Sequence, residues 1–273
     1  MADLFDAQPM SDQRPWTAVL LAGRRPGEDA FALSHGVSAK ALIEVGGEPM
    51  LGRVVRTLLA SPGVGRVVIL AQEPEALAAG TLQWLKHEPR IAFARSESGI
   101  STSVLALAGN EEAPWPVFVV TADHALLTPD MVTEFLAGTG NADAAVAVVE
   151  RRVVEAGYPE TRRTWLKFSD GHYTGANMFA LTGPPAQAAL RIWAEVERDR
   201  KKALKLLTRF GPWLAIRALT RTISLDAALA AAGRRAGLEV AAVRLSIAEA
   251  AIDVDKDADL ELARAIVARR SAR

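Results

Sequence analysis

Cysteine is absent from the sequence, and neither sign of charge prevails. Without cysteine there are no disulfides and no thiolate ligands for zinc, which fits a reducing compartment, and we expect a cytoplasmic protein. Lys plus Arg and Asp plus Glu both total 32, so there is no overall basic field that would attract nucleic acid or an anionic membrane. We therefore expect small-molecule partners and no nucleic acid.

Long hydrophobic runs are missing as well. The longest apolar stretches, 116–122 and 144–149, are far shorter than the roughly 20 residues that span a bilayer, so we expect no integral membrane segment. Residues 1–15 have neither a basic start nor a long apolar stretch, and we interpret them as a disordered tail instead of a signal peptide. The remainder, 16–273, is predicted to be one domain in which 183–235 form a helical elaboration.

Short apolar runs alternate with helical patterns along most of the chain. Strands are expected at 16–22, 67–71, 91–94, 117–121, 144–149, 177–181 and 240–245, with a short one at 41–45. Helices are expected at 49–59, 74–87, 101–108, 129–136 and 257–268, and 186–232 is almost wholly helical in composition. This alternation predicts an α/β fold, a mostly parallel sheet with helices on both faces. Only 151–170 loses the periodicity, which indicates an insertion or an acceptor-binding region.

The loop over residues 23–40 directly follows the first expected strand, where α/β sheets bind phosphates. Glycines such as Gly23 let backbone N–H groups approach a triphosphate, and Arg24 and Arg25 suit phosphate oxygens. The loop matches neither the Walker pattern nor the dinucleotide pattern of three spaced glycines, which disfavours an ATPase and a dehydrogenase. The competing interpretation is a surface loop with incidental charges.

Asp123 comes directly after an expected buried strand, at the edge where such sheets place ligands. The alternative, a helix-capping aspartate, is less favoured because Thr128 followed by Pro129 is the better start for the next helix. A carboxylate in this position suits a magnesium ion.

An acidic run near the C-terminus contains Asp253, Asp255, Asp257 and Asp259. It is not an EF-hand loop, because the sixth position is alanine and the twelfth is arginine. We expect Asp255 to end an extended segment and to face Asp123, with Asp257 near the start of the last helix. Asp253 and Asp259 are interpreted as solvated.

Weaker signals lie elsewhere. Residues 99–103 (GISTS) place small hydroxyl side chains before a helix, which suits contact with a base or ribose or equally an ordinary helix start. His124 and His172 are left out of the catalytic set, because lone histidines more often pack or donate hydrogen bonds. The basic residues at 162, 163, 167, 201, 202 and 205 suit an acceptor phosphate, or else a solvated face.

Several motifs resemble the MobA-like nucleotidyltransferases, the molybdenum-cofactor type and its sugar-phosphate and polyol-phosphate relatives. Residues 20–23 (LLAG), 38–42 (SAKAL) and 45–51 (VGGEPML) are similar to the family's glycine-rich signature, its lysine and its next helix start. Residues 121–128 are similar to its metal-binding aspartate motif, and 253–260 to its C-terminal D-x-D-T-x-E-D-L motif. The resemblance implies a three-layer, Rossmann-like fold of the GT-A-like type.

The resemblance also implies an activity. It is the transfer of a nucleotidyl group from a nucleoside triphosphate, with CTP favoured, to a phosphorylated sugar or polyol, with Mg²⁺ as cofactor and release of pyrophosphate. The implied catalytic residues are Lys40, Arg24 and Arg25, and the implied metal ligands are Asp123 and Asp255. The implied nucleotide-binding residues are Leu21, Ala22, Gly23, Lys40, Gly99, Ser101, Ser103 and Asp123, and the implied acceptor-binding residues are Thr174, Gly175 and Asn177. A homodimer is among the expected partners.

The sequence departs from the family pattern in its first loop, which is stretched and has Ala39 where a proline is common. The choice of catalytic arginine between Arg24 and Arg25 therefore stays open. Three alternatives remain: a molybdopterin-type acceptor, a GT-A glycosyltransferase, and a non-catalytic nucleotide-binding regulator. The glycosyltransferase is disfavoured because Asp123 is not part of an Asp-x-Asp pair, and the regulator because the lysine and both aspartates are retained together.

Overall fold

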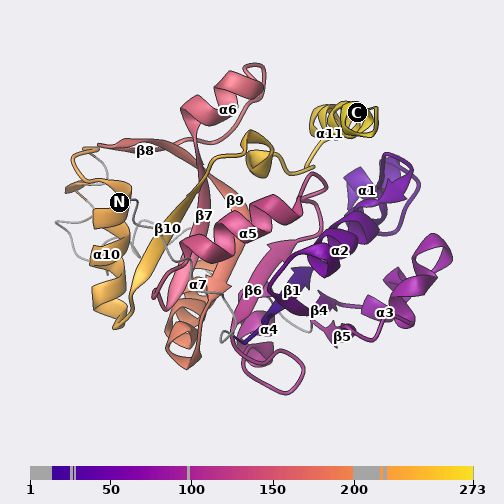
Figure 1. Ribbon diagram of the computed structural model, residues 1–273, viewed down its shortest axis with the longest axis horizontal. Helices are drawn as coiled ribbons and strands as arrows, with labels where there is room; N and C mark the ends of the chain where they lie inside the picture. The colour runs from indigo at the N-terminus through magenta and orange to yellow at the C-terminus, as the bar shows by residue number, and fades with distance from the viewer. Residues whose placement is uncertain are drawn as a thin grey trace, which may run out of the picture.

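The computed structural model describes residues 14–24, 27, 29–96, 99–198, 216–217 and 220–272. Most of the predicted tail and part of the predicted helical elaboration lie outside these residues. The centre is an eight-stranded sheet with the order β10-β7-β9-β6-β1-β4-β5, and β8 pairs with β9 (Figure 1). The strands are β1 Trp16–Leu21, β4 Val64–Ala71, β5 Ile91–Arg95, β6 Val117–Thr121, β7 Ala144–Glu150, β8 Leu166–Phe168, β9 Gly171–Leu181 and β10 Val240–Leu245.

The sheet is mixed but mostly parallel. β1 runs parallel to both β4 and β6, β4 to β5, and β7 to β10. β9 is antiparallel to its neighbours β6, β7 and β8. The carboxyl ends of β1, β4 and β6 therefore lie along one edge, where loops from distant parts of the chain meet.

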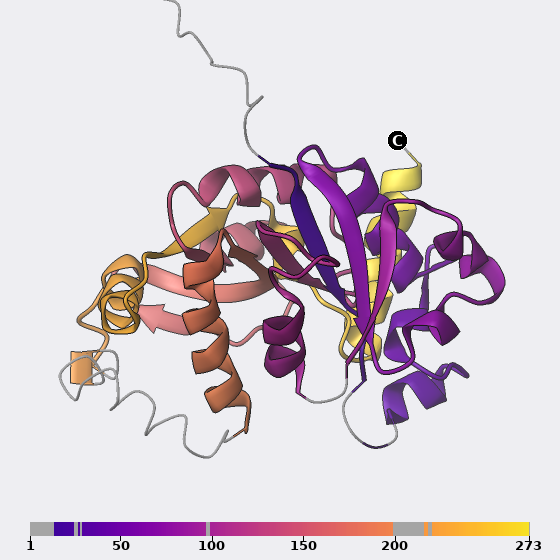
Figure 2. The same cartoon turned by 90° about the horizontal axis from the view of Figure 1, so that it is seen from below.

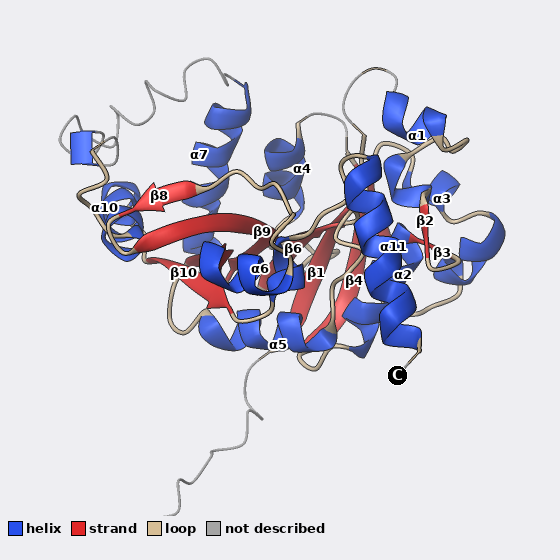
Figure 3. Cartoon of the chain, turned by 90° about the horizontal axis from the view of Figure 1, so that it is seen from above, coloured by secondary structure: helices blue, strands red, loops and turns tan. Residues whose placement is uncertain are grey.

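Helices cover both faces of the sheet. They are α2 Met50–Ala60 and α5 Pro129–Gly138 on one face, and α4 Ile100–Leu107 and α7 Gln187–Arg198 on the other (Figures 2 and 3). The buried side chains of β1 alternate accordingly: Ala18 and Leu20 join the apolar cluster that includes α2 and α5, whereas Val19 joins the cluster that includes α4 and α7. The predicted three-layer arrangement is confirmed.

Helix ends follow the expected local chemistry. The side chain of Thr128 accepts a hydrogen bond from the Met131 N–H at the start of α5, and Pro129 occupies the first turn, where a missing N–H costs nothing. Helix α10 (Leu225–Ala236) begins after Ser224, whose side chain caps it, and ends at Gly237 with φ 69°. A left-handed residue at that position favours glycine.

Some expected elements differ in the structure. The helix predicted at 74–87 is divided into α3 (Pro74–Leu77) and a 3-10 helix, η2 (Gly80–Lys86), because Gly80 has a positive φ of 57° that interrupts the helix. The strand predicted at 41–45 is reduced to β2 (Glu44–Val45), which pairs with β3 (Glu48–Pro49) after the 3-10 helix η1 (Lys40–Leu42).

The remaining elements lie around these. Helix α6 (Arg151–Gly157) occupies part of the segment in which the apolar periodicity is lost. The others are α1 Ala30–Ser34, η3 Pro184–Ala186, η5 Ala248–Ala251 and the terminal helix α11 Asp257–Ser271. Among the described helices, none is both long and apolar enough to cross a membrane.

Candidate active site

Three residues from distant segments meet beyond the end of β6. Asp123 follows this strand, Lys40 begins η1, and Asp255 precedes α11. The Nζ atom of Lys40 lies 2.5 Å from Asp123 Oδ2 and 2.6 Å from Asp255 Oδ1. The expected approach of Asp255 to Asp123 is thus present, and a lysine bridges the two carboxylates.

The pattern of residues 252–255 explains why Asp255 reaches this place. Ile252 and Val254 are fully buried in an apolar cluster that also contains Ile43 and residues of α11. Because the segment is extended, the alternate residues Asp253 and Asp255 are directed to the other side. The Val254 N–H donates to the Asp123 carbonyl at 3.1 Å, which joins the segment to the end of β6.

The ionic state of Lys40 follows from its two partners. Burial alone lowers the pKa of a lysine, but the charge and hydrogen bonds of Asp123, with those of Asp255, outweigh it, and the pKa of Lys40 is raised. The ammonium therefore stays charged at neutral pH. Its side chain is 25% exposed and that of Asp255 is 62% exposed, so the contact remains accessible to ligands.

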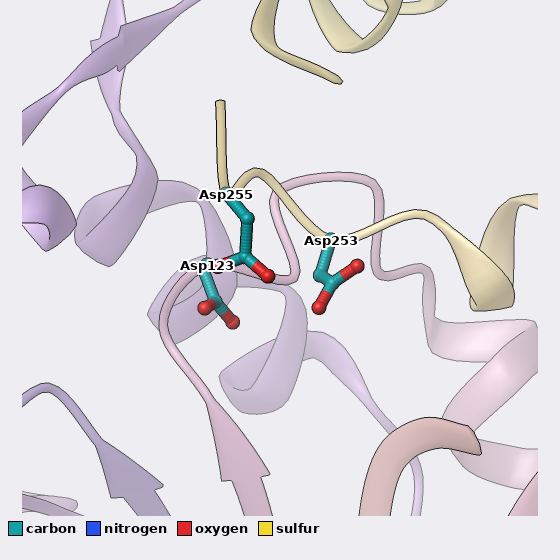
Figure 4. A group of neighbouring side chains, drawn as sticks. All are labelled: Asp123, Asp253 and Asp255. Atoms are coloured by element: carbon teal, nitrogen blue, oxygen red, sulfur yellow. The ribbon is translucent and has the colours of Figure 1, made fainter. Parts of the chain in front are cut away.

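A third carboxylate completes the group. Asp123, Asp253 and Asp255 each offer an oxygen within 4.8 Å of the others (Figure 4). These donors are all carboxylate oxygens, which suits a hard divalent cation such as Mg²⁺ and not a soft one. The residues present therefore fit the implied metal.

The expectation that Asp253 and Asp259 are solvated is wrong. Asp253 Oδ1 accepts from Arg163 Nη1 at 2.5 Å, and Asp259, with only 7% of its surface exposed, lies 3.4 Å from Arg163 Nη2. Burial raises the pKa of Asp253, and the negative charges of Asp123 and Asp255 add to this, whereas Arg163 opposes it. A cation 90 residues from Asp253 and 96 residues from Asp259 in the sequence holds both acidic side chains.

The loop after β1 is held by a residue that the sequence did not single out. The Gln72 side chain accepts from the Arg24 N–H at 3.0 Å and donates to the Arg24 carbonyl at 2.9 Å. Together with Ala22, Ser38 and Ala39, these two residues line a shallow pocket. Gln72 follows β4, the parallel neighbour of β1. Because parallel neighbours end at the same edge of a sheet, this position is the sequence signal that would have identified Gln72.

Of the other predicted residues in this region, the structure describes Leu21, Ala22 and Gly23. Leu21 ends β1, Ala22 is buried, and Gly23 is exposed beside the Gln72 side-chain amide. Arg25 lies outside the described residues.

The predicted base-binding residues begin helix α4. Ser101 is fully buried, and the Ile100 and Ser101 N–H groups each donate to the Glu197 carboxylate of α7 at 2.9 Å. The Ser101 hydroxyl also donates to Glu197, while Ser103 Oγ lies 2.9 Å from Ser96 Oγ. Gly99 is the N-cap residue of the helix. These hydroxyls are engaged within the protein, and nucleotide contact by them stays a prediction.

The predicted acceptor residues lie on β9, opposite β7. Thr174 is buried and Gly175 is exposed. The register between these strands shifts at Val146 and Val148, and Asn177 within this irregularity has φ 51°. Such bulges redirect side chains next to functional sites. Here Asn177 Nδ2 donates to Asp253 Oδ2 at 3.0 Å, so the half-buried amide contacts the carboxylate group.

The sequence also raised two histidines and a set of basic residues, and the structure describes some of them. Burial lowers the pKa of His124 to about 4, so its ring is neutral at pH 7. Arg163 pairs with carboxylates and its side chain is only 10% exposed, so the solvated-face alternative is wrong for this residue. Arg162 and Lys167 are exposed, and contact with an acceptor phosphate stays a prediction. Residues 201, 202 and 205 lie outside the described residues.

Known proteins resemble the chain in sequence and in fold. The family model for the MobA-like NTP transferase domain matches residues 18–209. A hypothetical transferase from Thermus thermophilus is 29% identical, with a TM-score of 0.74, over 91% of this chain and 100% of that one. No curated protein matches the sequence significantly.

Two more distant structures share the fold. One is CMP:2-keto-3-deoxy-manno-octonic acid synthetase complexed with CTP, 15% identical with a TM-score of 0.57, over 93% of this chain and 99% of that one. The other is a 4-diphosphocytidyl-2C-methyl-D-erythritol synthase from Anaerococcus prevotii, 11% identical with a TM-score of 0.56, over 94% and 97%.

Proposed function

Because the chain belongs to the MobA-like NTP transferase family and is thereby a nucleotidyltransferase, we propose that it transfers a nucleotidyl group from CTP to a phosphorylated sugar or polyol. The observation that carries the proposal is the Lys40 ammonium placed between Asp123 and Asp255 beyond β6. CTP is the first choice because the two distant structures with this fold are a synthetase complexed with CTP and a diphosphocytidyl synthase. The cofactor proposed is Mg²⁺, and pyrophosphate is the second product.

Asp123 and Asp255 would hold the magnesium ion, which when bound offsets negative charge on the triphosphate and leaves positions for its oxygens. Asp123 is fixed for this task by Thr121, whose hydroxyl donates to its Oδ1. Positioning and electrostatic stabilisation supply most of the acceleration in phosphoryl-transfer chemistry of this kind.

Lys40 and the loop after β1 act on the triphosphate itself. The Lys40 ammonium is charged and lies within reach of both metal ligands, so it is placed to offset charge that develops around the α-phosphate. Arg24 extends from the backbone that Gln72 holds, and it is exposed, so its guanidinium is placed to form charge-assisted hydrogen bonds with phosphate oxygens.

The acceptor needs no strong general base. A phosphate monoester has a second pKa of about 6, so at neutral pH it is largely a dianion that attacks phosphorus directly. The neutral, buried His124 is consistent with this, because no titrating histidine is required beside Asp123. Thr174, Gly175 and Asn177 are the acceptor-side residues of the proposal. Homodimer formation and a cytoplasmic location stay predictions.

The test measures pyrophosphate release. The protein is incubated with Mg²⁺, each of the four ribonucleoside triphosphates and a pool of sugar, polyol and pterin phosphates. We expect release that depends on CTP, on one sugar or polyol phosphate, and on Asp123, with Asp123→Ala lowering the rate by about a thousandfold or more.

Asp257→Ala is the matched control, because Asp257 has a side chain 75% exposed and contacts His35 instead of the carboxylate group. Its rate is expected to equal that of the wild type. Release that requires a pterin phosphate would favour the molybdopterin-type acceptor. Binding of a triphosphate without any release would favour the regulator, and an unchanged rate in Asp123→Ala would contradict the assignment.

A further inference from the structure

Arg163 is the most enclosed cation near the carboxylate group. It lies between α6 and β8, and its side chain is only 10% exposed. Its Nη1 donates to Asp253 Oδ1 at 2.5 Å, and its Nη2 lies 3.4 Å from Asp259 Oδ1. The two acidic partners stand on either side of Asp255 in the sequence. One guanidinium thereby joins both ends of the segment that carries a proposed metal ligand.

Both oxygens of Asp253 are engaged by residues other than Lys40. Oδ1 accepts from Arg163 and Oδ2 accepts from Asn177 at 3.0 Å. By distance alone Asp253 is close enough to share a cation with Asp123 and Asp255. The partners distinguish them: Lys40 contacts Asp123 and Asp255, whereas Arg163 and Asn177 contact Asp253.

We propose that Arg163 is a positioning residue that withholds Asp253 from the metal, so that Asp123 and Asp255 alone supply protein ligands. This inference rests on the proposed function. Magnesium in nucleotide enzymes takes one or two protein carboxylates and fills its octahedron with waters and phosphate oxygens. A third carboxylate would occupy a position that the triphosphate needs and would add negative charge opposite it.

The proposal predicts that removal of the positive charge of Arg163 strengthens the binding of a divalent cation. In Arg163→Met, Asp253 loses its strongest partner and becomes available as a third ligand, while a positive charge near the cation disappears. Binding of a divalent cation in the absence of triphosphate should therefore become tighter. If Arg163 only maintained the fold of the site, its loss would disorder Asp255 and weaken binding.

The experiment measures Mn²⁺ binding to the full-length protein without triphosphate, by electron paramagnetic resonance of the free ion. We expect the dissociation constant to fall about tenfold in Arg163→Met. In the double variant Arg163→Met/Asp253→Asn it should return to within about threefold of the wild-type value. In Asp253→Asn alone it should stay within about threefold of the wild-type value. Arg152→Met is the control for charge, since Arg152 is 81% exposed and pairs with Glu150. It should leave the constant unchanged.

Each alternative has its own result. Unchanged or weaker binding in folded Arg163→Met overturns the role of Arg163. Weakening in Asp253→Asn as large as in Asp255→Asn shows that Asp253 is already a ligand and also overturns it. A wild-type protein that binds no Mn²⁺ contradicts the metal site of the proposed function instead. If Arg163→Met does not fold, Arg163→Lys keeps the charge but loses the two-pronged contact, and absence of any gain in that variant overturns the proposal.

Discussion

Two cations, Lys40 and Arg163, hold different carboxylates of the acidic segment 253–259, and they do so differently. Lys40 joins Asp255 to Asp123, and its contact is open: its side chain is 25% exposed and that of Asp255 is 62% exposed. Arg163 joins Asp253 to Asp259, and its contact is more enclosed, with Arg163 and Asp259 each 10% exposed and Asp253 23% exposed. The same kind of ion pair thus occurs once at the surface of the site and once beneath it.

The difference teaches which contact can change during a reaction. A lysine ammonium is a compact charge on a flexible stem, and it can move from a carboxylate to a phosphate when a metal arrives. An arginine guanidinium is planar and fixes its partners by several directed hydrogen bonds. We therefore expect the Lys40 contact to serve the chemistry and the Arg163 contact to hold the geometry.

Among substitutions of the two cations and their neighbours, the largest effect is expected from Lys40→Met. Removal of the charge near the α-phosphate should lower the rate of pyrophosphate release by roughly 10² to 10³. The free energy of unfolding should change by less than about 1 kcal/mol, because the contact is open to solvent. Steady-state kinetics and urea unfolding followed by circular dichroism measure the two quantities.

Metal binding sharpens the comparison for this variant. Without its ammonium, the pair Asp123 and Asp255 should bind Mn²⁺ more tightly in the absence of triphosphate. This gain should persist when Asp253→Asn is added, whereas the gain in Arg163→Met should not. If the increase in Mn²⁺ affinity depends on Asp253 in both variants, then Lys40 and Arg163 do not act on separate carboxylates as described.

The next effect is on stability, in Arg163→Met. Without Arg163, the carboxylates of Asp253 and Asp259 lose the positive charge that they share. We therefore expect the free energy of unfolding to fall by about 3 kcal/mol. For a chain of this size that lowers the melting temperature by on the order of 10 °C. Addition of Asp253→Asn should recover part of the loss. An Arg163→Met protein as stable as Lys40→Met would end the distinction between the two contacts.

A smaller effect tests the third partner on the enclosed side, Asn177. Its φ of 51° favours asparagine or glycine, and its amide donates to Asp253. Asn177→Ala should lose both the hydrogen bond and the favourable backbone, whereas Asn177→Gly loses only the bond. Thermal unfolding should therefore show the glycine variant to be the more stable by about 1 kcal/mol. The reverse order would mean that the backbone at this bulge relaxes freely.

The smallest effect concerns Tyr158, at the start of the loop that leads to Arg163. Its hydroxyl donates to Glu249 at 2.8 Å, and burial together with this contact raises its pKa to about 12. Because the folded protein keeps this proton longer than the unfolded chain does, the stabilisation is present below pH 10 and is lost as the pH rises toward 12.

Comparison with Tyr158→Phe isolates this contribution. The variant should show a slightly shallower loss of stability between pH 10 and 12 than the wild type, measured by urea unfolding at each pH. Identical slopes would indicate that the hydroxyl is equally free to ionise in both states.

Sequence alone determined the layers of the fold and the exposed part of the site, which consists of Lys40, Asp123 and Asp255. Apolar runs of strand length, separated by helical patterns, predict a mostly parallel sheet because these periods are local properties of the chain. Asp123 was recognised from its position after a buried strand, and Lys40 and Asp255 from their motifs. Helix starts such as that at Thr128 were equally local, since a cap involves residues three apart.

Only the tertiary structure decided the contacts of Arg163 and Asn177 with Asp253 and that of Gln72 with Arg24. Arg163 and Asp253 are 90 residues apart, Asn177 and Asp253 are 76 apart, and Gln72 and Arg24 are 48 apart. Nothing in the local pattern distinguishes an arginine that will be buried between carboxylates from one that will be solvated. Asp253 and Asp259 were misjudged for the same reason: the environment of a charged side chain is set by which distant elements pack against it, and that depends on the whole fold.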